Sequence, residues 1–223
     1  MSKAELDEVE RAQYESVLEE ERAIARHVGP LADAAHRQLV RKMLGLEGGL
    51  AREVERRTAG NPAFAVQLVG EWVDSGRLVP GPQGFRLKGG IPSSLPDGLM
   101  GVWRERVARL LKRLKPDERG ALELAAVLGV DFESRVWRKA CKQGGIPLDS
   151  GLVGTLFRSH LLLADSRVEH LRFAHEGVRA ALIERISPDV LKRYHGLAAD
   201  VLTARGGGDA EQLGVHLIEA ERL

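Results

Sequence analysis

The sequence predicts a mainly α-helical fold with two short pairs of β-strands. Apolar residues three and four positions apart recur over most of the 223 residues, which is typical of amphipathic helices. Glycine and proline clusters separate these stretches, and short β-type runs flank a turn in only two places. We expect helices over residues 4–23, 31–44, 50–59, 62–75, 97–114, 117–128, 133–142, 149–160, 175–186, 189–204 and 209–223.

At the N-terminal end, apolar residues lie between acidic ones over 4–23, which predicts an amphipathic helix with a solvated acidic face. Residues 24–28 predict a short strand that Gly29 and Pro30 end. Two helices over 31–44 and 50–59 follow.

The helix over 62–75 has the clearest boundaries. Asn61 suits its N-cap, Pro62 suits its first position, and Gly76 suits its C-terminal stop. One face of this helix is apolar and is expected in the core; it carries Phe64, Leu68 and Trp72.

A hairpin is predicted next, with residues 78–79 and 85–87 on either side of a turn over 81–84. Residues 89–96 are rich in glycine, proline and serine and predict a linker at a domain boundary.

In the second half, Pro116 ends the helix over 97–114. Three helices over 117–160 precede two strands over 161–164 and 169–173, and this order is the pattern of a winged-helix domain with a small β-wing. The last two helices are similar to the start of a TPR-like repeat array, in which one helix pair does not bury its own face.

His175 closes a predicted strand and opens a helix. An imidazole at such a place can donate a hydrogen bond to a phosphate near neutral pH. The alternative is a histidine that caps the helix or fills a corner of the core. Arg179, one turn later, either shares the face of His175 or pairs with Glu176 or Glu184.

Gly60, Asn61 and Pro62 form a second short motif. A proline ring offers a rigid apolar contact, and the exposed amides of a helix start favour hydrogen-bond acceptors. An Asn-Pro pair before a helix is also a common cap, so both interpretations stand.

Residues 56–64 and 171–179, in this order and spacing, resemble the two nucleotide-sensing motifs in the lid and winged-helix domains of the signal-transduction ATPases with numerous domains (STAND). These are AAA-like P-loop regulators found, for instance, beside bacterial kinase and cyclase modules. The resemblance implies a remnant of the nucleotide-binding domain over 1–30, a helical lid over 31–92, a winged helix over 93–187 and the start of helical repeats over 188–223.

The resemblance also implies that Gly60, Asn61, Pro62, His175 and Arg179 contact ADP or ATP in a regulatory switch. Pro62 would pack against the adenine, and His175 would contact the β-phosphate. Both side chains should then face one cavity, open on the side where a P-loop domain docks.

No G-x-x-x-x-G-K-[ST] sequence occurs in the chain, so we expect no ATPase activity. Nucleotide would bind only if a P-loop domain, in cis or in trans, completes the site, and we expect no metal in this chain. The expected partners are that domain, a helical-repeat array and other proteins.

Composition restricts other functions. The net charge of +1 creates no global field for nucleic acid or an anionic membrane, and the single Cys141 excludes an internal disulfide. Without a signal peptide or a run of about 18 apolar residues, we expect a cytoplasmic protein that does not span a membrane.

Two alternatives stay open. The first is a non-catalytic protein interaction module. The second is a winged-helix nucleic-acid-binding protein, although the third helix over 149–160 offers only Arg158 as a firm positive charge, and we do not expect sequence-specific DNA binding. Basic residues cluster instead over 104–115 and 135–142, as a solvated face or a nonspecific patch.

Overall fold

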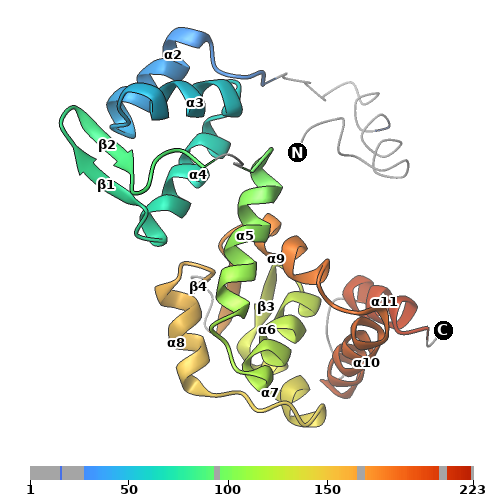
Figure 1. Ribbon diagram of the computed structural model, residues 1–223. Helices are drawn as coiled ribbons and strands as arrows, with labels where there is room; N and C mark the ends of the chain where they lie inside the picture. Colours follow the sequence, from blue (N-terminus) through green and yellow to red (C-terminus); the bar gives the residue numbers. More distant parts are fainter. Residues whose placement is uncertain (1–15, 17–27, 93–95, 165–168, 206–209, 222–223) are drawn as a thin grey trace.

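The computed structural model describes residue 16 and residues 28–92, 96–164, 169–205 and 210–221. This part of the chain is mainly helical, with two small antiparallel sheets (Figure 1). The predicted mainly α class is confirmed. The predicted helix over 4–23 and strand over 24–28 lie almost wholly outside the described residues.

The first part of the described fold packs helices α2, η2, α3 and α4 beside a hairpin. A predicted helix over 31–44 occurs as an α-helix followed by a π-helical turn, η2. The elements are α2 (Asp33–Gln38), η2 (Leu39–Met43), α3 (Gly48–Thr58), α4 (Pro62–Asp74), β1 (Leu78–Gly81) and β2 (Gly84–Leu87).

Helix α4 begins at Pro62, as the sequence Asn61-Pro62 predicts. The Asn61 side chain accepts a hydrogen bond from the Phe64 amide at 3.0 Å, and Pro62 occupies the first helical position. The predicted apolar stripe of α4 is buried, and the hairpin pairs Leu78 with Leu87. These local predictions are confirmed.

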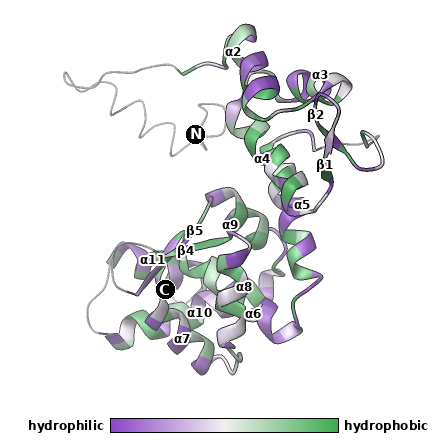
Figure 2. Cartoon of the chain, turned by 90° about the vertical axis from the view of Figure 1, so that its left-hand side faces the viewer, coloured by the Kyte–Doolittle hydropathy of each residue, from purple (hydrophilic) through white to green (hydrophobic). Residues whose placement is uncertain are grey.

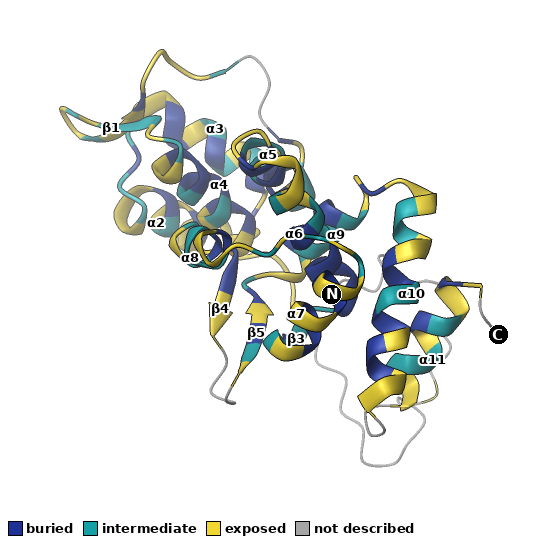
Figure 3. Ribbon diagram, turned by 90° about the horizontal axis from the view of Figure 1, so that it is seen from below, coloured by how far each residue is buried: buried dark blue, intermediate teal, exposed yellow. Residues whose placement is uncertain are grey.

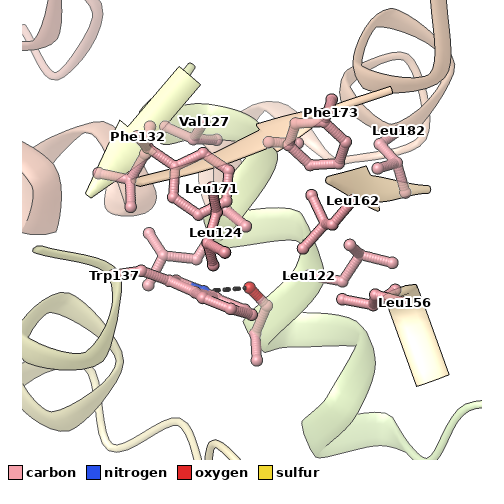
Figure 4. Packing of buried hydrophobic residues seen from close by; sticks show 14 of the residues in the cluster. Leu122, Leu124, Val127, Phe132, Trp137, Leu156, Leu162, Leu171, Phe173 and Leu182 are labelled. Atoms are coloured by element: carbon pink, nitrogen blue, oxygen red, sulfur yellow. Dashed lines mark hydrogen bonds between the residues drawn. The ribbon is translucent and has the colours of Figure 1, made fainter. Parts of the chain in front are cut away.

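The second part adds helices around a three-stranded sheet of order β3-β5-β4. Strand β3 was not predicted, because three residues are too few to show a period; Phe132 at its centre packs against Trp137 and Phe173 (Figure 4). The elements are α5 (Leu99–Leu111), α6 (Pro116–Leu128), β3 (Asp131–Glu133), α7 (Ser134–Gln143), α8 (Ser150–Arg158), β4 (Leu162–Ala164), β5 (His170–Phe173), α9 (Glu176–Ile183), α10 (Pro188–Arg205) and α11 (Ala210–Glu219).

The buried residues form two hydrophobic clusters, and the boundary between the clusters lies inside α5. Val102 belongs to the first cluster, with α3 and α4, whereas Trp103 belongs to the second, with α6 to α10. Buried positions are dark blue in Figure 3, and the hydrophobic and hydrophilic colours alternate along the helices in Figure 2, as expected of amphipathic segments. Helix α5 therefore joins the two cores.

Helix α10 buries its apolar face against α6 and α7, so that Tyr194, Ala198 and Leu202 belong to the second core. Between α10 and α11, His195 and His216 place their Nδ1 atoms 3.0 Å apart. Burial, with His195 and Arg179 nearby, lowers the pKa of His216 to about 4.

Candidate functional site

The candidate site lies where α4 and α9 begin. His175 is the N-cap residue of α9 and has an extended backbone, but its side chain makes no capping hydrogen bond. The residue is exposed rather than packed in the core. The side chain of His175 therefore neither caps the helix nor fills a corner of the core.

Two side chains from other helices hold the His175 ring. Trp103 of α5 stacks on it, with ring centroids 4.6 Å apart and planes inclined by 30°. Gln67 of α4 places its Nε2 atom 3.1 Å from the Nε2 atom of His175, across 108 positions of sequence. Helix α5 contacts both α4 and α9 and brings them together (Figure 1).

The contact with Gln67 bears on the protonation of His175. Partial burial, and to a smaller extent the charge of Arg106, lower the pKa of His175 below its usual value. A neutral ring with its proton on Nδ1 accepts from the Gln67 amide at Nε2. If the amide turns over, its oxygen accepts instead from a protonated Nε2. Gln67 can therefore hold the ring in either charge state.

Pro62 begins an exposed apolar stripe on α4. Val66 and Val73 have 44% and 57% of their surface exposed and lie four and eleven positions after Pro62, on the same face of the helix. We call Pro62, Val66 and Val73 the α4 stripe. Gln67 directly follows Val66 but points about 100° around the helix from it, so the histidine contact lies on a different side of α4 from this stripe.

The expected shared cavity, open on the side of a P-loop domain, stays a prediction. Pro62 and His175 are both exposed, and two cavities of the described residues are lined by other side chains. The candidate site is an open surface on adjoining helices. Such a surface can contact a second domain, but it does not enclose a ligand by itself.

Gly60 and Asn61 position Pro62 through the backbone. Gly60 has a φ of +81°, and a Cβ atom there would lie 2.8 Å from the Leu31 carbonyl oxygen. Its own carbonyl accepts from the Leu31 amide at 2.8 Å. With Asn61 used as the cap, both residues have structural roles in the turn that starts α4.

Arg179 is half-buried and contacts helix α6. Its Nε atom donates to the Ala126 carbonyl of α6 at 2.8 Å, and burial lowers its pKa. Glu184, which the sequence offered as a partner, instead forms a bidentate pair with Arg104. Arg179 thus joins α9 to α6, and the nucleotide contact expected for it has no support in this arrangement.

Sequence reasoning missed Gln67 and Trp103. Gln67 is the polar residue within an otherwise apolar stretch of α4, which is a weak sign of a partner outside the core. Trp103 carries no local sign of its role, because its contact with His175 depends on the tertiary packing of α5 against α9.

Many basic residues considered for nucleic acid are occupied in ion pairs. Arg104 pairs with Glu184, and both Arg135 and Arg138 approach Glu169. The only basic residue within α8 is Arg158. Ion pairing reduces the positive charge that these helices offer to phosphates.

A search against models of known protein families finds no match for this chain, and a search of curated proteins finds no relative. Within the described ranges, no helix combines the length and the apolarity needed to cross a bilayer. The same residues contain no group of three His, Cys, Asp or Glu side chains placed to hold a metal ion.

Proposed function

We propose that this chain is the lid and winged-helix part of a STAND-type signal-transduction ATPase, a cytoplasmic regulatory element that contacts bound ADP or ATP without hydrolysing it. The observation that carries the proposal is the contact between Gln67 and His175. It brings together the helix that starts with Pro62 and the helix that starts with His175, which are the two segments of the resemblance.

The order of elements agrees with this proposal. Helices α2 to α4 with the β1–β2 hairpin correspond to the lid. The order α6, β3, α7, α8, β4, β5 gives three helices with a wing, and β3 completes its sheet. Helices α10 and α11 correspond to the first pair of a repeat array.

The exposed groups suit the two ends of a nucleotide. The α4 stripe offers an apolar face for an adenine ring, and the His175 imidazole offers a donor for a phosphate oxygen. The P-loop and the magnesium ligands must come from another domain. ADP and ATP would then bias the docking of that domain through their different phosphate contacts.

The test is calorimetry with ADP and a P-loop domain of this ATPase family supplied as a separate chain. His175→Asn removes the imidazole, and asparagine suits an N-cap, so α9 should still form. His160→Asn is the matched control, because His160 is also exposed and asparagine tolerates its positive φ of 50°.

We expect His175→Asn to weaken ADP binding about tenfold or more, as for loss of a charge-assisted hydrogen bond, and the control to leave it unchanged. Pro62→Ala should also weaken the binding of ADP relative to the native chain. Pro80→Ala, at an exposed proline of β1, is its control and should leave ADP binding unchanged. Absence of ADP binding to the mixture, or equal loss in both histidine variants, would refute the proposal.

The α4 stripe also favours a second function, a protein interaction module without nucleotide. Its exposed valines would then contact a protein partner directly. Calorimetry distinguishes the nucleotide switch from the interaction module, because an interaction module binds its protein partner in the absence of ADP.

A further inference from the structure

A cavity of about 290 Å³ lies between the end of α4, the second half of α5 and the end of α8, apart from His175 and the α4 stripe. We call it the arginine pocket, because four guanidinium groups line it. Two carboxylates line it as well. Its residues are Glu71, Asp74, Arg106, Arg109, Leu110, Arg113, Thr155, Arg158, Ser159 and Leu161.

Two of the four arginines are neutralised by carboxylates of α4. Arg106 pairs with Asp74 at 3.2 Å, and its Nη2 atom also donates to the Ser159 carbonyl at 2.6 Å. Arg109 pairs with Glu71, whose side chain is almost fully buried. These pairs fix the position of α4 against α5.

The other two arginines leave the pocket with an excess of positive charge. Within the described part of the chain, neither Arg113 nor Arg158 forms an ion pair with a carboxylate, and Arg158 donates only to the Thr155 hydroxyl at 3.1 Å. Four arginines line one pocket, and burial, followed by the positive charge of Arg113, lowers the pKa of Arg109. An anion would relieve this repulsion.

Glu71 contributes to the pocket through its ion pair with Arg109. Its Oε2 atom has almost no accessible surface and no hydrogen-bond partner among the described residues, so a ligand in the pocket does not contact this oxygen. The pocket suits a ligand whose negative oxygens accept hydrogen bonds from the guanidinium groups of Arg113 and Arg158.

A phosphate group meets this requirement, because its oxygens accept paired hydrogen bonds from the planar guanidinium group of arginine. Sulfate offers similar acceptor oxygens. The volume is at the lower limit of small-molecule sites, which favours a phosphate or diphosphate group over a whole nucleotide.

We propose that the arginine pocket binds a small phosphate-class anion, with Arg113 and Arg158 donating to its oxygens. The bound anion joins the end of α8 to the residues that follow α5, beside the ion pairs that hold α4.

Calorimetry of the full chain in a phosphate-free buffer tests this, with inorganic phosphate, pyrophosphate and sulfate as probes. We expect Arg113→Gln and Arg158→Gln each to weaken phosphate binding about tenfold or more. Arg172→Gln and Arg37→Gln, at exposed arginines outside the pocket, are the controls and should have no effect. Thermal melts verify that each variant folds.

Sulfate should compete with phosphate for the pocket, so Arg113→Gln and Arg158→Gln should weaken the binding of both anions. Sulfate binding that is equal in the native chain and in both arginine variants would overturn the assignment of these two residues. No phosphate binding at millimolar concentration, or equal loss in the control variants, would overturn the pocket as a whole.

Two further comparisons identify the source of the phosphate. The first comparison uses a DNA duplex. If the duplex binds with an affinity that falls steeply with salt, while inorganic phosphate and pyrophosphate do not bind, the small-anion site is overturned. His175→Asn should leave phosphate binding unchanged. Failure of the nucleotide proposal is therefore distinguishable from failure of this one.

Discussion

Replacing Gly177 with alanine should destabilise the protein, because the new methyl group has no room beside Trp103. A Cβ atom at position 177 would lie 2.3 Å from Cδ1 and 2.5 Å from Nε1 of the indole. Non-bonded carbon atoms pack best at about 3.5–4.0 Å. Trp103 is 3% exposed and stacks on His175, so the indole cannot simply turn into solvent.

The magnitude follows from two opposed effects. Alanine inside a helix is favoured over glycine by about 0.5–1 kcal/mol. Overpacking of a filled core costs about 1–3 kcal/mol. Since the gap of 2.3 Å requires α9 or α5 to shift, we expect overpacking to prevail and the free energy of unfolding to fall by about 1–2 kcal/mol.

Urea unfolding followed by circular dichroism measures this difference. Gly214→Ala in α11 is the matched control, because a Cβ there meets no atom within 4 Å and should stabilise the protein by up to about 1 kcal/mol. A Gly177→Ala protein as stable as the native chain would refute the packing of α9 against Trp103, and with it the geometry of His175.

Three further outcomes are expected. Asn61→Ala should lower the free energy of unfolding by about 1 kcal/mol, whereas Asn61→Asp, which keeps a capping oxygen, should not; equal urea midpoints for the two would contradict the cap. Because His195 and His216 are buried with lowered pKa values, their contribution to stability is present above about pH 6.5 and is lost as the pH falls toward about 4; a flat profile of urea midpoints over that range would count against the pair. Burial raises the pKa of the Cys141 thiol to about 12, so a disulfide reagent at pH 8 should label it only after unfolding, and rapid labelling of the native chain would contradict its burial.

Features that depend on neighbouring residues could be predicted from the sequence. The start of α4 follows from Asn61 and Pro62, which act within one turn, and the buried face of α4 follows from its helical spacing. The β1–β2 hairpin likewise follows from a turn with short flanking runs.

Features that depend on distant contacts could not be predicted. Strand β3 forms because β5, about forty positions later, supplies its partner. The division of the cores inside α5, rather than at the linker over 89–96, follows from packing of α5 on both α4 and α9. Arg158, considered only as a DNA contact, lines the same pocket as Arg113, which local sequence does not indicate.

Nuclear magnetic resonance titration of the His175 imidazole tests the central claim most directly. His175→Asn identifies its Cε1–H resonance among those of the seven histidines. In the free chain the pKa should lie below the usual value for histidine, because the ring is partly buried near Arg106. When ADP and the P-loop domain are added, phosphate should stabilise the imidazolium and raise this pKa. A pKa that is the same with and without ADP would contradict the account.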